Sequence, residues 1–353
     1  MFSRVHISQI SFLEKFHSQL HSADQRWDSI RRIPYSTPGR WVHILDLSKL
    51  AFTCQSQALL LDSLLTRLFP LLPFLARFSI SPSFVLSHHA MASLAGREEV
   101  SHIRSLEGIA YVPSHRSVIT GEEPLVQLLR CCHNLEELEV IGPGLDPSEF
   151  EFPFDTADVL LPESFTPLNL SNLHTLTLLS MHSSPLMATL QLSLLPSLRK
   201  LTMTPYDDIP YPASLVSHFI ATHGATLRSL LLYTPKSWPT KLSPSPYTLL
   251  HTSPNLRHLS LENPLPSLTV APTHPLQILS IPRPNPEFWR ILERLLPQLP
   301  SLRAVRARDV RWLRKGMTLR AQEAGVQGEM REWRRRLFRR GIRVLDTDWK
   351  ENE

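Results

Sequence analysis

The chain has 353 residues, of which 42% are hydrophobic and 20% charged, and this composition excludes an intrinsically disordered polypeptide. Three cysteines (Cys54, Cys131 and Cys132) cannot form a disulfide framework in so long a chain, so we expect an intracellular protein, cytoplasmic or nuclear. The net charge of +5 is unevenly distributed. Residues 303–343 contain 14 basic and 4 acidic residues, which leaves the rest of the chain at about −5.

The sequence predicts no contact with a membrane. Its first residues contain no apolar run that could serve as a signal peptide. The most apolar segment, residues 58–69, includes Asp62 and Arg67 and is too short to cross a bilayer.

Residues 1–40 are predicted to form an N-terminal cap. Apolar residues around Val5 indicate a short strand, and a helix should follow from Ser11, with Leu13, Phe16 and Leu20 on one face. Ser11 and Glu14 have the spacing of a capping box. Prolines and a glycine in residues 34–39 then indicate a turn that ends the cap.

One apolar phrase recurs along the rest of the chain. Its clearest copy, residues 195–203, has the order L-x-x-L-x-x-L-x-M, and further copies lie at 134–140, 172–178 and 255–261. The closing L-x-L has the period of a strand with one buried face, and the copies are mostly about 25–33 residues apart, which suits a strand plus a helix. Residues 41–308 are therefore predicted to form an α/β leucine-rich-repeat solenoid, with a curved parallel sheet inside and helices and proline-rich loops outside.

The repeat strands are expected at ten places, and the intervening helices at four. The strands should include Leu45, Phe78, Leu106, Leu138, Leu176, Leu201, Leu230, Leu259, Leu279 and Val305. The helices should cover 58–69, 212–222 and 286–296, and another should start near Pro124 with Leu125, Leu128 and Leu129 facing inward. A glycine at position 224 is placed to end the helix at 212–222. Residues 142–167, with six carboxylates and five prolines, are predicted to be an acidic loop inserted into one repeat.

Motifs for catalysis or for binding of a cofactor are not found. The chain contains no phosphate-binding loop, dinucleotide fingerprint or nucleophile elbow. Cys131, Cys132 and His133 have no second pair of ligands at a zinc spacing, so we expect a structural role for the cysteines. His88 and His89 are interpreted as a solvated pair in a loop. We therefore expect no enzyme, catalytic residue, metal or cofactor.

The strand residues that alternate with the leucines should lie on the concave face of the sheet, where such a scaffold usually binds a partner. These candidate partner-binding residues are Asp46, Glu107, Glu137, Glu139, Lys200, Leu231, Tyr233, His258, Glu262, Arg306 and Arg308, and Arg77, Ser79 and Thr202 have the same register. The alternative interpretation is a solvated sheet face with no partner. Leu231 and Tyr233, as exposed apolar groups, favour a contact patch.

Residues 309–353 are predicted to form a basic C-terminal cap. Val326, Met330, Trp333 and Leu337 recur at helical spacing, Gly341 should end the helix, and residues 342–344 should form a final strand. The favoured role is to cover the end of the solenoid. The alternative is binding of nucleic acid or another polyanion by the arginines of this segment, which are Arg331, Arg334, Arg335, Arg336, Arg339 and Arg340.

The sequence also resembles the leucine-rich-repeat part of fungal F-box proteins, of the kind that is abundant in mushroom-forming fungi. The similar segments are the opening M-F-S-R-V-H-I-S with the helix around Leu13 and Phe16, the first repeat strand at 40–47, and the recurrent P-x-L-x-x-L-x-L phrases. The resemblance implies a substrate receptor of a cullin-type ubiquitin ligase. The F-box, which would precede these segments and dock the linker subunit of the ligase, is missing, so we do not expect the linker subunit as a partner. An unknown protein on the concave face is the expected partner. A GTPase-activating repeat protein is a third possibility, but its arginine loop is not identified.

Overall fold

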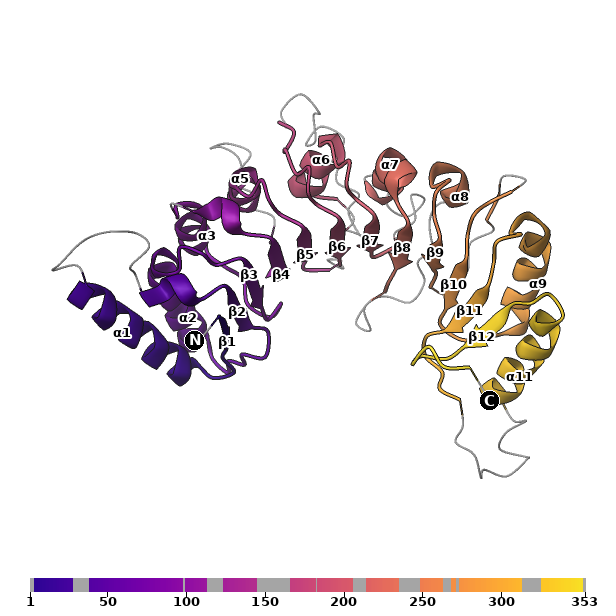
Figure 1. Ribbon diagram of the computed structural model, residues 1–353, viewed down its shortest axis with the longest axis horizontal. Coiled ribbons are helices and arrows are strands. Elements are labelled where there is room, and N and C mark those ends of the chain that lie inside the picture. Colours follow the sequence, from indigo (N-terminus) through magenta and orange to yellow (C-terminus); the bar gives the residue numbers. More distant parts are fainter. Residues whose placement is uncertain are drawn as a thin grey trace, which may run out of the picture. The chain divides into compact units, whose positions relative to one another are not determined.

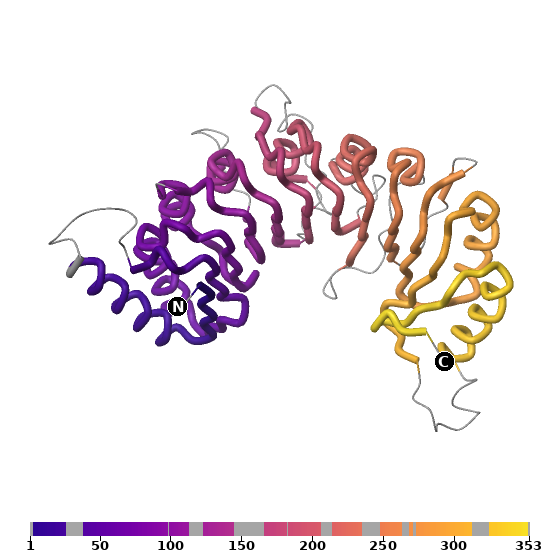
Figure 2. The backbone as a smooth tube through the Cα atoms, in the orientation of Figure 1, coloured from indigo at the N-terminus to yellow at the C-terminus, as the bar shows by residue number. Residues whose placement is uncertain are grey.

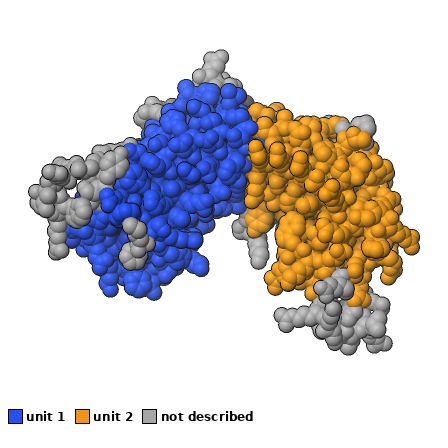
Figure 3. Space-filling model, viewed as in Figure 1, with its two compact units in different colours: residues 1–198 blue, residues 199–353 orange. Residues whose placement is uncertain are grey.

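The computed structural model describes residues 3–27, 38–97, 99–112, 123–144, 166–181, 183–205, 214–234, 248–262, 268–270, 273–312 and 325–351. The chain divides into two compact units, residues 1–198 and 199–353 (Figure 3). Each unit is described by itself.

The first unit alternates strands with helices. Its elements in chain order are β1 (Arg4–His6), α1 (Ile10–Trp27), the 3-10 helix Pro38–Trp41, β2 (Ile44–Leu47), α2 (Gln55–Leu68), the 3-10 helix Phe69–Leu71, β3 (Arg77–Ile80), α3 (His88–Ala95), the 3-10 helix Val100–His102, β4 (Ser105–Ala110), α5 (Pro124–Cys131), β5 (Glu137–Ile141), β6 (Thr175–Leu179) and α6 (Pro185–Leu192).

The second unit continues the alternation with shorter helices. Its elements are β7 (Lys200–Met203), α7 (Val216–His223), the 3-10 helix Gly224–Thr226, β8 (Ser229–Leu232), α8 (Leu249–Thr252), β9 (His258–Ser260), β10 (Ile278–Ile281), α9 (Pro286–Leu295), the 3-10 helix Leu296–Gln298, β11 (Ala304–Ala307), α11 (Gly325–Phe338) and β12 (Arg343–Leu345).

Within each unit the strands follow one another in chain order and neighbouring strands are parallel. The helices of each unit lie on one side of its sheet (Figure 1). The backbone of each repeat runs along a strand, crosses to the helical side and returns to the next strand (Figure 2). The predicted fold class, an α/β leucine-rich-repeat solenoid with a parallel sheet inside and helices outside, is confirmed.

The repeated leucines form the core because they occupy one register across the sheet. Leu201 aligns with Leu230 and Leu230 with Leu259, and all three side chains are fully buried. The residues between them, such as Thr202, are partly exposed on the other side of the sheet. Burying one leucine relative to leaving it in water contributes about 1.5–3 kcal/mol, so the recurrence of this column in every repeat holds the solenoid together.

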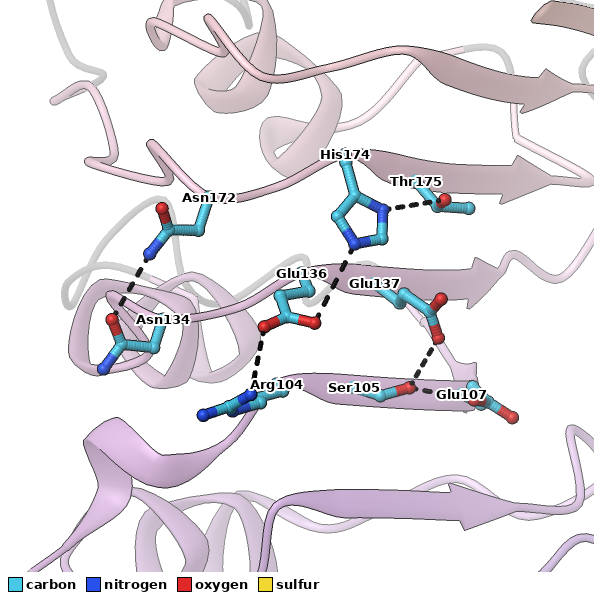
Figure 4. Close-up of polar contacts among 9 residues, drawn as sticks. All are labelled: Arg104, Ser105, Glu107, Asn134, Glu136, Glu137, Asn172, His174 and Thr175. Atoms are coloured by element: carbon cyan, nitrogen blue, oxygen red, sulfur yellow. Dashed lines mark hydrogen bonds and ion pairs between the residues drawn. The ribbon is translucent and has the colours of Figure 1, made fainter.

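Asparagine in the repeat phrase joins one repeat to the preceding repeat. Asn134 donates from Nδ2 to the carbonyl of Ser101 at 3.0 Å, and Asn255 donates in the same way to Ala225 at 2.8 Å. Asn172 donates to the side-chain oxygen of Asn134 at 3.3 Å (Figure 4). These side chains satisfy carbonyl groups at corners where the backbone cannot pair with itself.

Local capping explains where several helices begin. Ser87, Ser184 and Asn285 each accept a hydrogen bond from the backbone N–H three residues later. Proline follows directly at positions 185 and 286, where a helix needs no N–H donor. The predicted start of a helix at Asn285 is therefore confirmed.

The structure corrects one prediction about a local element and confirms another. His88 and His89 are exposed, but they form the first turn of α3 and not a loop, because Ser87 caps a helix whose apolar face includes Leu94. Gly224 directly follows α7 as its C-cap, as predicted, and it has a right-handed φ of −56°. A Cβ atom at this position would lie 2.3 Å from the carbonyl oxygen of Thr252, and this close approach requires glycine.

Two further predictions lie wholly or partly outside the described residues. Most of the predicted acidic loop at 142–167 lies outside the described residues, because positions 145–165 are not described. The first part of the helix predicted at 212–222 is also outside, and α7 is described from Val216. No helix in the described parts of the chain has the length and apolar character needed to cross a membrane.

The C-terminal helix packs on the last repeat as the apolar stripe predicts. Met330, Trp333 and Leu337 are buried. The indole of Trp333 stacks on Phe288 with ring centroids 5.6 Å apart, and it meets Trp289 edge-on at 5.2 Å. After the helix, Gly341 adopts a left-handed φ of 70°, and the chain enters β12.

Candidate functional site

The structure places the predicted partner-binding residues on strands or within two residues of a strand's end, and none of them is fully buried. It divides them into two groups. Asp46, Glu107, Glu137 and Glu139 lie in the first unit and form what we call the acidic face. The other seven, Lys200, Leu231, Tyr233, His258, Glu262, Arg306 and Arg308, lie in the second unit.

The acidic face is held by hydroxyl groups and by backbone N–H groups. Ser105 lies between two carboxylates, 2.8 Å from an oxygen of Glu107 and 3.4 Å from an oxygen of Glu137 (Figure 4). Ser79 donates to the second oxygen of Glu107 at 3.1 Å. Glu139 accepts from the backbone N–H of Gly108 at 3.2 Å. These neutral donors orient the carboxylates without cancelling their charge.

Burial and neighbouring charges shift two carboxylate pKa values in opposite directions. Burial raises the pKa of Glu139, and the nearby carboxylate of Glu107 adds to this effect. Burial also acts to raise the pKa of Asp46, but hydrogen bonds from Ser48 and His6 outweigh it, so the pKa of Asp46 is lowered. The His6 ring lies 2.9 Å from the Asp46 carboxylate.

A row of alternating charges borders the acidic face, and the sequence did not point to it. The row occupies the residue directly before each strand. The carboxylate of Glu136 lies 3.5 Å from Arg104 and 3.8 Å from His174 (Figure 4). Because Arg104 and Glu136 have opposite charges and adjoin, this border contributes little net charge beside the acidic face.

His258 lies between two serine hydroxyl groups on the face in the second unit. Its Nδ1 lies 3.3 Å from the hydroxyl of Ser229 and its Nε2 lies 2.8 Å from the hydroxyl of Ser280. Burial lowers the pKa of His258 to about 4, with smaller contributions from Arg306, Lys200 and Arg308. The imidazole is therefore neutral at pH 7 and exchanges hydrogen bonds with both hydroxyl groups.

Arg308 and Glu262 form an ion pair beside this histidine. Their closest atoms are 2.6 Å apart, and both side chains are largely buried. Arg308 also donates to the hydroxyl of Ser260 at 2.9 Å and to the carbonyl of Leu261 at 3.1 Å. Burial raises the pKa of Glu262, although the guanidinium group acts in the opposite direction. The pair links the ends of the neighbouring strands, so the main role of these two residues is structural.

Trp349 lies on the same face, and the sequence interpretation missed it. The guanidinium of Arg306 sits 4.1 Å from the indole centroid, and the His258 ring meets the indole edge-on at 5.9 Å. The carboxylate of Asp346 organises the turn that presents this residue, because it accepts from the backbone N–H groups of Asp348 and Lys350, each at 2.9 Å. The sequence signal was the D-T-D-W-K segment, since aspartate at such a spacing favours a turn of this kind.

Trp349 combines exposure with an unusual backbone conformation. Its side chain is 46% exposed and its φ is +61°, in the left-handed region that residues other than glycine rarely adopt. Tyr233, 43% exposed, adds a second aromatic group, whereas Leu231 is only partly exposed. The exposed side of the sheet in the second unit is therefore aromatic and basic, in contrast to the acidic face of the first unit.

The arginines of the C-terminal segment are on the side of α11 opposite the buried stripe or just beyond the helix. Glu332 lies 2.8 Å from Arg335 and 2.7 Å from Arg336, and the Arg336 guanidinium also lies 4.9 Å from the indole centroid of Trp289. Arg339 and Arg340 follow the helix and are exposed, while Arg331 and Arg334 are partly exposed. Part of the positive charge predicted to meet a polyanion is thus neutralised within the helix.

Two groups among the described residues contain a side chain that could act as a nucleophile in other proteins. Ser280 and His258 resemble a nucleophile and its base, but Ser280 is fully buried, so a substrate could not reach its hydroxyl. Cys132 is also buried, and burial raises its pKa to about 12, which keeps the thiol protonated. Within the described part of the chain, no three His, Cys, Asp or Glu residues are grouped closely enough to hold a metal ion.

Comparison with known proteins adds little to this geometry. No family model matches the chain, and no curated protein matches it. A protein of Bacteroides fragilis, known from a structural genomics crystal structure, is similar with 13% sequence identity and a TM-score of 0.42, over 96% of this chain and 84% of that chain. At this TM-score the similarity supports no statement about function.

Proposed function

We propose that the protein is a non-catalytic scaffold that binds another protein on the exposed side of its sheet. It would act like the repeat domain of an F-box substrate receptor, in keeping with the resemblance of its repeats to that family. The α/β solenoid supports the proposal, because stacked repeats present a continuous row of side chains along one face.

The observation that carries the proposal is a cluster of carboxylates on the acidic face that have no ion pair with Lys or Arg in the described residues, although the exposed Arg77 aligns with Ser105 on the adjacent strand. Glu107, Glu137 and Glu139 lie on two adjacent strands, and within the described residues their polar partners are hydroxyl or backbone N–H groups, with no Lys or Arg among them. Like charges on neighbouring strands destabilise a sheet. A bound cationic segment would relieve this repulsion, so the partner should present Lys or Arg side chains to this face.

The proposal can be tested with a defined basic probe. A dye-labelled peptide of alternating Lys and Ser would be titrated with the full chain by fluorescence anisotropy. The variant Glu107→Gln with Glu137→Gln removes two charges from the acidic face and should weaken binding about tenfold or more.

A matched control removes two charges elsewhere in the same unit. On α1, Glu14 is exposed and Asp24 is partly exposed, and Glu14→Gln with Asp24→Asn should leave the affinity within about twofold of the original chain. Equal weakening by both double variants, or no binding of the probe by the original chain, would refute the acidic face as a binding surface.

A further inference from the structure

Four arginines occupy the same position in successive repeats of the second unit. Each one follows a buried leucine of the repeat phrase and directly precedes a strand. They are Arg199 before β7, Arg228 before β8, Arg257 before β9 and Arg303 before β11, and we call them the arginine row. Gln277 takes the equivalent position before β10.

Backbone hydrogen bonds fix the alignment of the row. The N–H of Arg228 donates to the carbonyl of Arg199 at 2.8 Å, and the N–H of Arg257 donates to that of Arg228 at 2.9 Å. The ladder continues from Arg257 through Gln277 to Arg303, with both bonds at 2.8 Å. Adjacent strands are about 4.8 Å apart, so three arginines stand side by side and the fourth follows two strands later.

The four side chains are exposed and have no partner of opposite charge in the described parts of the chain. The segments that contain the row, residues 195–203, 223–233, 253–260, 274–281 and 299–307, contain no Asp or Glu at all. Lys200, next to the first arginine, and Arg343, at the start of β12, are exposed as well and add to the charge. This edge of the sheet is therefore uniformly positive.

The first unit shows that the repeat does not require this arrangement. The same position before the strand holds Arg104, Glu136 and His174, which are joined by the same ladder of backbone hydrogen bonds. There Arg104 and Glu136 form an ion pair at 3.5 Å, and the His174 ring lies 3.8 Å from the same carboxylate. In the arginine row, neighbouring like charges fall within the screening length of about 8 Å at physiological salt and repel one another. This repulsion destabilises the folded chain, and a bound anionic ligand would reduce it.

We propose that the arginine row binds an acidic segment of a partner protein. The planar guanidinium group matches a carboxylate with two parallel hydrogen bonds, and regular spacing along the sheet edge would engage several carboxylates of an extended chain. Tyr233 is the single Phe, Tyr or Trp in the segments of the row, and it lies at the opposite end of β8 from Arg228, so the row itself lacks the stacking surfaces on which single-stranded nucleic acids bind. The proposal is independent of the acidic face, because it concerns the other unit and a ligand of opposite charge.

The test uses the full chain and a dye-labelled peptide of alternating Glu and Ser, with fluorescence anisotropy at two salt concentrations. A peptide with Gln in place of Glu is the neutral control, and single-stranded and duplex oligonucleotides of equal charge are further arms. Combining Arg199→Gln, Arg228→Gln and Arg257→Gln should weaken binding of the Glu peptide by about tenfold or more. Combining Arg334→Gln, Arg339→Gln and Arg340→Gln removes the same charge in the C-terminal segment and should change the affinity by less than about twofold.

A series with Lys in place of the same three row arginines separates charge from geometry. It should fold as the original chain does, and it should lose part of the affinity, because lysine keeps the charge but not the two-pronged contact. Three results would overturn the proposal: no binding of the Glu peptide by the original chain, equal weakening by the row and control variants, or tighter binding of an oligonucleotide than of the peptide through the same row.

Discussion

Arg97 shows how a single buried charge can organise several turns of the first unit. Its side chain is only 6% exposed. It donates to the carbonyl groups of Leu72 at 2.7 Å, of Leu94 at 3.2 Å and of Leu75 at 3.5 Å, so it closes the corners between two successive repeats. Burial lowers the pKa of Arg97 to about 10, and the group therefore stays charged at pH 7.

We expect Arg97→Met to lower the free energy of unfolding by about 3 kcal/mol, because it removes charge-assisted hydrogen bonds and leaves buried carbonyl groups unpaired. Arg104→Met is the matched control. The Arg104 side chain is 63% exposed and its ion pair with Glu136 is a surface pair, so the change should be about 0.5 kcal/mol or less. Urea denaturation of both variants measures the difference. Similar losses in both would show that Arg97 is not a structural link.

His258 should make the stability of the protein depend on pH. Its pKa is about 4 in the folded chain and 6.5 without the fold, so the unfolded chain takes up the proton first as the pH falls. The contribution of the neutral His258 imidazole to the free energy of unfolding is complete above pH 6.5, and it is lost as the pH falls from 6.5 to 4. It amounts to roughly 3 kcal/mol at most.

His258→Gln should therefore flatten the loss of stability between pH 7 and pH 4.5, as measured by denaturation at several pH values. His251→Gln, at an exposed position, should retain the slope of the original chain. Identical slopes for the original chain and His258→Gln would mean that the imidazole is not buried as described.

At the scale of the element, the strand β4 shows how one residue can re-aim a functional side chain. The register with β5 shifts between Leu106 and Ile109, and Gly108 at this bulge has a φ of +70°. A Cβ atom there would lie 2.0 Å from the carbonyl oxygen of Ile80, so only glycine fits. The bulge turns the N–H of Gly108 toward Glu139 and thereby fixes one carboxylate of the acidic face.

The helix α11 combines a buried apolar stripe with an exposed basic side. Trp333→Ala should lower the free energy of unfolding by about 3–5 kcal/mol, because burial is lost and a cavity remains. Arg335→Ala, at a side chain that is 71% exposed, should change it by less than about 0.5 kcal/mol. Thermal or chemical denaturation of both variants gives the comparison. Small and equal effects would mean that the helix does not cover the last repeat and is available to a partner.

At the scale of the whole molecule, the sequence predicts the regular parts of the fold well. The L-x-x-L-x-L phrase identifies the strands because burial alternates along them, and Asn285 followed by proline identifies the start of α9. The short helix α3 was missed because its capping serine precedes two histidines and a run of small residues with little amphipathic contrast.

The candidate sites could be predicted only in part. Alternation along the strands placed Glu107, Glu137 and Glu139 on one face, but the hydrogen bonds of Ser105 and the bulge at Gly108 depend on pairing between strands. The sequence contains the arginine row as a recurrent Leu-Arg pair. That these arginines stand side by side follows only from the backbone hydrogen bonds that align Arg228 with Arg199. Trp349 could not be assigned to a face, because a turn and not a strand positions it.

The central claim is that a partner protein occupies the exposed side of the sheet, and carboxylate labelling tests it most directly. Carbodiimide-coupled labelling followed by mass spectrometry would compare the free chain with the chain saturated with the Lys-Ser peptide. We predict that labelling of Glu107, Glu137 and Glu139 falls on binding, while labelling of Glu14 and Asp24 on α1 does not change. Protection of the α1 carboxylates with unchanged labelling of the acidic face would contradict the claim.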